Sequence, residues 1–194
     1  MRRLIRLTTL LALALTLSPM RSAAAQDLPL GEVGVDYNYV HTNAPPGGCG
    51  CFSMNGGDAW IAYNLPRSFA VIAQVASQHA SNIAGSGTDL RLSSYLFGSR
   101  YSLHNSTRFV PFAQVLLGGA HASGSFAPGS AGYPGSANAF AMTVGGGLDL
   151  KLSMRFAVRA FEADYYFTEF ANRVNDHQNN LRVSAGLIFR FGKQ

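Results

Sequence analysis

Two His-x-Ser pairs are the residues of this sequence that could carry out covalent chemistry. They are His79-Ala80-Ser81 and His121-Ala122-Ser123. Residues two apart share one face of a strand, so the imidazole could serve as a base for the serine hydroxyl. A hydrolase also needs an acid that orients the base and donors for the oxyanion, and no obvious carboxylate follows either pair. Because histidine and serine are also ordinary residues of rims and loops, we favour a non-catalytic interpretation.

A second set of chemically active side chains consists of acids and arginines within segments that alternate between apolar and polar residues. Alternation places such charges together on one strand face. If the strands close into a small barrel, that face lines an interior just wide enough to be filled by side chains. An unpaired buried ion costs several kcal/mol, so we predict a mutually neutralising network without a continuous pore, in preference to a catalytic or ion-conducting path. The predicted network is Glu32, Asp36, Asp89, Arg91, Asp149, Glu162, Asp164, Arg182 and Arg190, with Arg159 as a further candidate.

The elements that would position these residues are strands. Clusters of Gly, Ser and Asn separate alternating stretches, and no segment after the N-terminal region has the pattern of a long amphipathic helix. Most stretches exceed the ~5–6 residues typical of strands in soluble sheets and fit the ~9–11 residues that cross a bilayer on a tilt. The eight predicted strands span about 31–41, 56–64, 69–79, 88–101, 108–120, 138–150, 155–168 and 181–191.

The last of these strands shows the alternation most clearly. From Leu181 to Phe191 one face is wholly apolar, while the other carries Arg182 and Arg190. A soluble sheet would bury the apolar face against a core, whereas a transmembrane barrel would turn it toward lipid. The lengths of the connections decide between the two.

Short and long connections alternate along the chain. Short ones fall at about 64–68, 102–107 and 151–154, and long ones at about 42–55, 80–87, 121–137 and 169–180. Outer-membrane barrels have this pattern because every second connection is a short periplasmic turn. We therefore predict an all-β fold, an eight-stranded antiparallel up-and-down transmembrane β-barrel with both termini on one side.

Two details of the strand faces are less clear from the sequence. In the seventh strand, Phe156 and Val158 are out of phase with Phe161 and the apolar residues after it, so either a β-bulge near 159–161 or an interfacial Arg159 is required. Aromatic residues near strand ends are expected to form the interface girdles. They are Tyr37, Tyr39, Trp60, Tyr63, Phe69, Phe109, Phe189 and Phe191.

The N-terminal segment has the pattern of an export signal. A basic start, an apolar stretch over 7–17 and Ala23-Ala24-Ala25 predict a signal peptide covering 1–25 and a single barrel domain covering 26–194. Removing the signal's four arginines leaves 11 basic against 10 acidic residues. The basic balance of the whole chain is therefore no argument for nucleic-acid binding.

The two cysteines lie one residue apart in a Pro- and Gly-rich segment. Export permits a disulfide between Cys49 and Cys51, although so short a ring would be strained. A metal site would need further ligands, and none lies at a suitable spacing. We interpret the pair as a loop staple or two free thiols, and we predict no metal and no cofactor.

The closing segment resembles the assembly signal of outer-membrane proteins. Its pattern is Ser184-x-Gly186-x-x-Phe189-x-Phe191, although three further residues follow it. With four further segments, it makes the chain from about 28 to 192 similar to the OmpA/OmpX-like outer-membrane barrel family. These segments are Tyr-Leu-Phe-Gly-Ser-Arg-Tyr at 95–101, Pro-Phe-Ala-Gln at 111–114, Gly-Gly-Gly-Leu-Asp at 145–149 and Ala-Asp-Tyr at 163–165.

That resemblance implies a place in the outer membrane and contact with its lipid. It also implies assembly by periplasmic chaperones and the barrel-assembly machinery. Together with the strand pattern, it leads us to expect a monomeric barrel with a structural or surface-interaction role. Two alternatives stay open: a small passive channel, and a lipid-modifying hydrolase similar to the lipid A deacylases, which resemble eight-stranded barrels with a His-x-Ser pair and a carboxylate.

Overall fold

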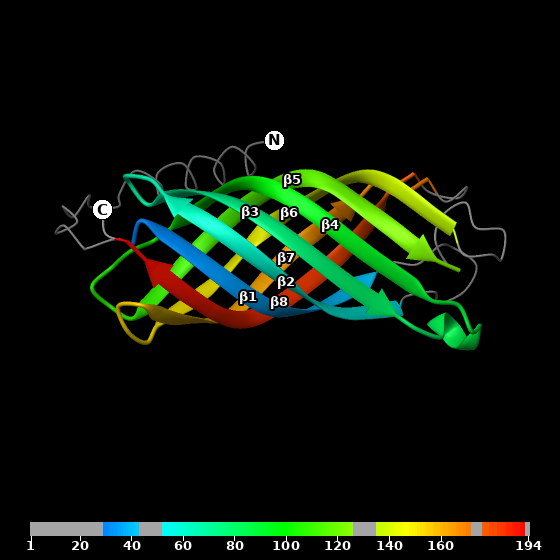
Figure 1. Cartoon of the computed structure of the whole chain (residues 1–194), viewed down its shortest axis with the longest axis horizontal. Helices are drawn as coiled ribbons and strands as arrows, with labels where there is room; N and C mark the ends of the chain where they lie inside the picture. The colour runs from blue at the N-terminus through cyan, green and yellow to red at the C-terminus, as the bar shows by residue number, and fades with distance from the viewer. Residues whose placement is uncertain (1–28, 43–51, 126–134, 172–175, 193–194) are drawn as a thin grey trace, which may run out of the picture.

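The computed structural model describes residues 29–42, 52–125, 135–171 and 176–192. Eight antiparallel strands, each hydrogen-bonded to its sequence neighbours, close between β1 and β8 into one barrel (Figure 1). The strands are β1 (Gly31–Thr42), β2 (Phe52–Asn64), β3 (Phe69–Ala80), β4 (Leu90–Ser102), β5 (Phe109–Gly124), β6 (Gly135–Lys151), β7 (Phe156–Thr168) and β8 (Gln178–Phe191). This confirms the predicted fold class.

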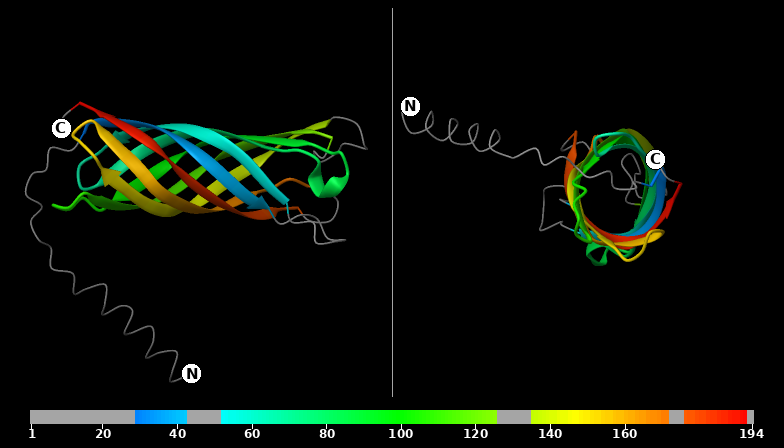
Figure 2. Two further views of the ribbon diagram at one scale, coloured as in Figure 1. Left: turned by 90° about the horizontal axis from the view of Figure 1, so that it is seen from below. Right: turned by 90° about the vertical axis from the view of Figure 1, so that its left-hand side faces the viewer.

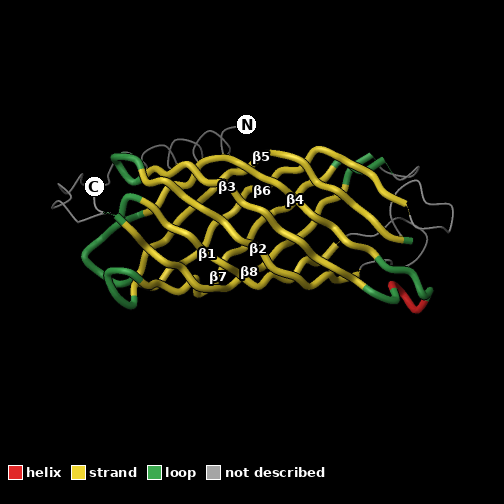
Figure 3. Tube along the Cα trace, in the orientation of Figure 1, coloured by secondary structure: helices red, strands yellow, loops and turns green. Residues whose placement is uncertain are grey.

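The two ends of the barrel differ. The three short turns, at 65–68, 103–108 and 152–155, lie at the same end as the start of β1 and the end of β8. The opposite ends of the strands lie at the other end of the barrel (Figures 1 and 3), where the connection between β3 and β4 contains a short 3-10 helix, η1 (Ile83–Gly85). We call these the turn end and the loop end. Among the described residues, no helix has both the length and the apolar character needed to cross a membrane.

Side chains alternate between the lumen and the outer wall along each strand. In β8 the apolar face from Leu181 to Phe191 points outward, as the sequence predicts, and Arg182 and Arg190 are buried inside. Because lipid takes the place of a core on the outside, most charged side chains of the strands face the interior of the closed barrel, whose ring of strands is seen end-on in Figure 2. Toward the loop end the lumen also holds apolar side chains, among them Val40, Met54 and Leu92, beside buried polar ones such as Gln78 and Asn180.

The seventh strand contains a bulge, one of the two alternatives left open by the sequence. On the β6 side, Leu148 pairs with Phe161 and Asp149 pairs with Arg159, so Ala160 has no partner. The register shifts at the same place on the β8 side. The alternative, Arg159 at a membrane interface, is wrong because its side chain is fully buried. The extra residue lets Arg159 and Glu162 face the lumen together while the aromatic residues on either side face outward.

One predicted girdle residue also lies elsewhere. Trp60 is buried in the lumen, whereas the other seven aromatic residues are exposed on the outer wall. The reason is Gly34, which pairs with Trp60 across β1 and β2. A Cβ atom at Gly34 would overlap the indole ring, so the absence of a side chain there gives the indole its place inside.

Candidate functional site

The centre of the lumen is organised around Arg159 of β7. Its Nη1 donates to Asp36 Oδ2 at 3.0 Å and to Glu162 Oε2 at 2.5 Å, and its Nε donates to Asp149 Oδ1 at 3.1 Å. The three acids come from β1, β7 and β6, and all four side chains are at most 5% exposed. One guanidinium therefore ties together three strands, and the fork of donors on arginine suits it to this better than the point charge of lysine.

Two aromatic rings hold this guanidinium and a second one. The Cζ atoms of Arg100 and Arg159 lie 4.3 and 4.6 Å from the centroid of Trp60, and 4.7 and 4.5 Å from that of Phe112. Trp60 Nε1 also donates to Asp36 Oδ2 at 2.8 Å. Two like charges thus share the faces of two rings, where cation–π attraction of about 2 kcal/mol each when desolvated offsets part of their repulsion.

The network extends from Arg159 toward the loop end through Arg182 of β8. Arg182 donates to Asp164 Oδ2 through Nε and Nη2, at 3.0 and 2.6 Å. Its Nη2 also lies 3.5 Å from Glu162 Oε1, which accepts a hydrogen bond from Gln114 at 2.9 Å. Glu162 is therefore the link between Arg159 and Arg182.

Toward the turn end, Glu32 lies between two arginines. Arg190 Nε donates to Glu32 Oε1 at 2.9 Å, and Arg100 Nη1 lies 3.7 Å from Oε2. Arg100 is also joined to Gln114, whose Oε1 accepts from Arg100 Nε at 3.2 Å. These contacts connect the turn-end pair to the centre, so one polar assembly runs along the lumen.

The structure brings seven of the nine predicted charges, and the further candidate Arg159, into this lumen network. The prediction is wrong for Asp89 and Arg91. Asp89 precedes β4 and is exposed, and Arg91 points outward from β4. The prediction that Arg91 faces the lumen would turn Leu90 and Leu92 toward lipid, but both leucines are buried in the lumen.

Three charged or aromatic members were not predicted: Asp58, Arg100 and Trp60. They could have been found from neighbouring large apolar residues that face lipid, such as Ile61 in β2 and Phe97 in β4, because residues an odd number of positions away then face the lumen. Asp58 differs from the other acids, because within the described ranges it has no ion-pair partner. Its Oδ2 accepts a 2.6 Å hydrogen bond from Asn38, and Oδ1 is buried without a partner.

The residues of the predicted assembly signal fall on both sides of β8. Ser184 faces the lumen, and Phe189 and Phe191 are exposed on the outer wall near the turn end. Phe189 packs edge-on against Phe156 at 5.4 Å. Gly186 lies where a Cβ atom would overlap Asp36 Oδ1 and the Val35 carbonyl. Its lack of a side chain therefore makes room for the network, and its role in assembly stays a prediction.

The two His-x-Ser pairs differ in the structure. Ser81 follows the end of β3, so it does not share a strand face with His79. His121 and Ser123 both lie on the outer side of β5, and His121 Nδ1 lies 2.7 Å from Asn138 Oδ1 of β6. In the tautomer with the proton on Nδ1, His121 would donate to this oxygen, and Nε2 would be free as a base.

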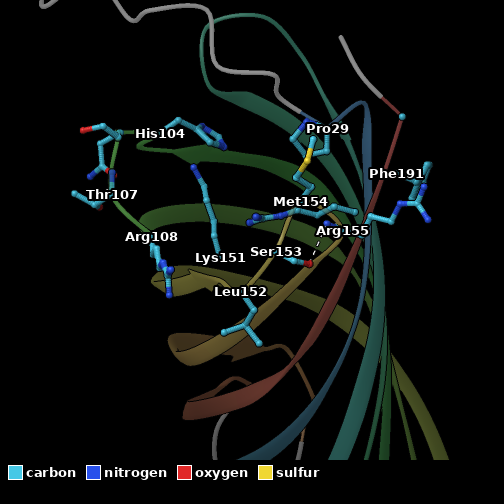
Figure 4. A pocket seen from close by; sticks show the side chains of 14 residues that line it. Pro29, His104, Thr107, Arg108, Lys151, Leu152, Ser153, Met154, Arg155 and Phe191 are labelled. Atoms are coloured by element: carbon cyan, nitrogen blue, oxygen red, sulfur yellow. Dashed lines mark hydrogen bonds between the residues drawn. The ribbon is translucent and has the colours of Figure 1, made fainter.

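The turn end carries a cavity of about 760 Å³ between the turns and the end of β8 (Figure 4). Its lining includes the basic residues Arg108, Lys151, Arg155 and Arg190, together with His104. Burial and, after it, the nearby charge of Lys151 lower the pKa of His104. Glu32 balances the charge of Arg190, whereas Arg108, Lys151 and Arg155 have no such acidic partner in the lining. The described residues therefore give this cavity a net positive charge.

No group of three His, Cys, Asp or Glu residues in the described part of the chain is placed to hold a metal ion. Cys49, Cys51 and the predicted signal peptide lie outside the described residues.

Comparison with known proteins agrees with this geometry. The sequence model for the outer membrane protein beta-barrel domain matches residues 9–189. This chain belongs to that family. Membership and fold together place it in the outer membrane, as the closed barrel with an apolar outer wall requires.

Solved structures of other outer-membrane barrels share the fold of this family member. Neisserial surface protein A superposes with a TM-score of 0.64 at 14% identity, covering 83% of this chain and 97% of that one. Ail of Yersinia pestis has a TM-score of 0.50 at 17% identity, covering 82% and 99%. The N-terminal barrel of Pseudomonas aeruginosa OprF has a TM-score of 0.50 at 15% identity, covering 86% and 100%. No curated protein matches significantly.

Proposed function

We propose that this protein is a monomeric outer-membrane barrel with a closed lumen, and that it acts as a structural and surface-interaction component of the cell envelope. The observation that carries the proposal is the lumen network. Arg159 and its three carboxylate partners join β1, β6 and β7 at the centre of the barrel with almost no exposure. A lumen filled in this way leaves the outer wall and the long loops as the surfaces that can meet other molecules.

Conductance separates this proposal from the passive channel. The purified barrel, reconstituted in a planar bilayer, is expected to show no stable conductance. Arg159→Ala, which opens space at the centre of the lumen, serves as the sensitised comparison. Stable channels formed by the unaltered protein would refute the closed lumen.

The surface role calls for a test in cells. Cross-linking on intact cells is compared between the unaltered chain and a variant whose segment 125–134 is replaced by a Gly-Ser linker of equal length. Partners that depend on this loop should be lost while the barrel still reaches the membrane. An identical set of cross-linked partners would remove this loop from the proposal.

Assembly by chaperones and the barrel-assembly machinery is part of the same proposal. It is supported by the exposed Phe189 and Phe191 at the turn end of β8. Phe191→Ala should lower the yield of folded protein in the outer membrane, and Phe109→Ala, an exposed aromatic on another strand, should not. Equal yields would count against a signal in β8.

A lipid-acyl hydrolase is the second candidate function, and the 2.7 Å contact between His121 Nδ1 and Asn138 Oδ1 favours it. In this scheme His121 would accept the proton of the Ser123 hydroxyl, and Asn138 would orient the imidazole. The test is release of fatty acid from lipid A by the purified barrel. No release, or undiminished release by Ser123→Ala, would remove this assignment.

A further inference from the structure

The outer wall of the barrel carries one arginine close to the loop end of a strand. Across the eight strands, the other Asp, Glu, Lys and Arg residues face the lumen or line the cavity at the turn end, and Arg91 alone points toward the membrane. An arginine facing the bilayer midplane costs about 2–4 kcal/mol, but close to zero near the interface. Arg91 is the second residue of β4, at the loop end, so we infer that it lies near the interface, where lipid headgroups begin.

Arg91 is surrounded by hydrogen-bonding side chains that also face outward. Across the strands it pairs with His79 of β3 and Ser123 of β5, and one step closer to the membrane Ser93 pairs with His121. Arg91 has no ion-pair or hydrogen-bond partner among the described residues. We call His79, Arg91, Ser93, His121 and Ser123 the polar patch. The nearest carboxylate along the chain is that of Asp89, which precedes β4 and forms no ion pair with Arg91; its Oδ1 accepts a hydrogen bond from the Asn82 backbone N–H. A phosphate group would therefore be the anion that pairs with Arg91.

An apolar groove begins on the membrane side of this patch. Its volume is about 590 Å³, within the ~300–1,000 Å³ typical of ligand sites. Ala59 and Ala73 form its floor between large exposed side chains on either side: Val35 and Ile61 on one, Tyr95 and Phe97 on the other. We call it the outer-wall groove.

The strand register fixes how the groove and the patch are related. Val75 and Tyr95 of the groove form one cross-strand pair, Ser77 and Ser93 form the next, and His79 and Arg91 form the one after that. Each step is two residues, or about 7 Å along a strand. Arg91 is therefore roughly 14 Å above the top pair of the groove, a distance along the strand that the acyl chain of one lipid can span.

We propose that the polar patch and the outer-wall groove together bind one phosphorylated glycolipid of the outer leaflet. The phosphate lies on Arg91 and His79, with an acyl chain over Ala59 and Ala73. The loop end would face the cell exterior, where the outer leaflet supplies the lipid. A guanidinium binds phosphate through two parallel hydrogen bonds, and the groove adds apolar contact that a phosphate alone would lack. This inference rests on membership of the outer-membrane family and is independent of the lumen and the loops.

Native mass spectrometry of the full barrel in detergent tests the proposal. The probes are bisphosphorylated lipid A, the same lipid A with its phosphates removed, and phosphatidylglycerol. We expect the first to bind at least tenfold more tightly than either of the others. Equal binding of dephosphorylated lipid A would overturn the phosphate contact, and equal binding of phosphatidylglycerol would overturn the assignment to a glycolipid.

Three variants connect the binding to the site. Arg91→Gln is expected to weaken binding of bisphosphorylated lipid A about tenfold, and Ala73→Phe, which fills the groove, should weaken it as well. Arg108→Gln is the matched control, because it removes an exposed arginine at the turn end and should leave binding unchanged. Heat-modifiable gel mobility verifies that each variant folds. Binding by Arg91→Gln or Ala73→Phe equal to that of the control would refute the site.

Discussion

Replacing Arg159 by methionine is the most direct test of the lumen network. Methionine keeps much of the volume between Trp60 and Phe112 but removes a cation shared by Asp36, Asp149 and Glu162. Removing one partner of a buried ion pair costs about 3–5 kcal/mol, because the remaining charge is left uncompensated. Three carboxylates depend on this cation, so we expect a loss of about 4–5 kcal/mol.

That loss corresponds to a change of about 10³-fold or more in the ratio of folded to unfolded protein, at 1.4 kcal/mol for each factor of ten. Urea unfolding in a lipid or detergent system measures it. Trp60 is the only tryptophan of the chain and lies against Arg159, so its fluorescence reports on the lumen. Heat-modifiable gel mobility provides a second readout that does not depend on the local environment of the indole.

Two further variants distinguish the loss of charge pairing from a loss of stability that any arginine-to-methionine substitution would cause. Arg91→Met makes the same change on the outer wall, where no partner is lost, and should cost less than about 1 kcal/mol. Arg159→Met combined with Glu162→Gln removes one of the stranded charges and should be about 1–2 kcal/mol more stable than Arg159→Met alone. A cost below 1 kcal/mol for Arg159→Met, or a double variant less stable than Arg159→Met, would refute the reasoning.

Three other changes probe the fold and the turn end. Gly186→Ala introduces a Cβ atom against Asp36 and the adjacent backbone, and it should lower stability in urea by about 1–3 kcal/mol. Deleting Ala160 removes the bulge and shifts one part of β7 by one residue, which exchanges its two faces. No heat-modifiable barrel should form, and a normally folded product would contradict the bulge assignment. Burial and the charge of Lys151 lower the pKa of His104, so the unfolded chain binds a proton more readily. Stability should fall as the pH drops below about 6.5, and the decline in urea titrations should be smaller in His104→Gln.

The sequence was sufficient to predict which face points toward lipid in those strands whose two faces differ strongly in polarity. In β8 the charges lie on one face and six apolar residues on the other. Turning the strand over would expose the arginines to lipid and bury the apolar side chains among the charges of the lumen, so only one orientation is possible. The alternating lengths of the connections then gave the closed topology, since they depend on which end of the barrel a connection crosses. The change of phase in the apolar residues of β7 indicated an irregularity, and the buried position of Arg159 then showed that it is a bulge.

The sequence was misleading where both faces of a strand carry apolar side chains. In β4 the choice lay between turning Leu90 and Leu92 or Tyr95 and Phe97 toward lipid. The presence of Arg91 favoured the wrong choice, because a charge was expected inside. Arg91 is the second residue of β4, and an outward arginine costs little near the end of a membrane-spanning strand. Likewise, the inward position of Trp60 depends on Gly34, which is far away in sequence and becomes its neighbour only when β1 and β2 pair.

The arrangement of charge along the lumen also bears on the channel alternative. At the centre, Arg100 and Arg159 contact both Trp60 and Phe112, and the acids that hold Arg159 come from three strands. An ion crossing this level would have to displace a guanidinium from several partners at once, and each broken buried pair costs several kcal/mol. Closer to the loop end it would meet Val40, Met54 and Leu92, which are packed beside the buried polar side chains of Asn38 and Gln78. Side chains also fill the lumen on the loop-end side of Arg159, so removing Arg159 alone should open the centre without producing a fully open pore.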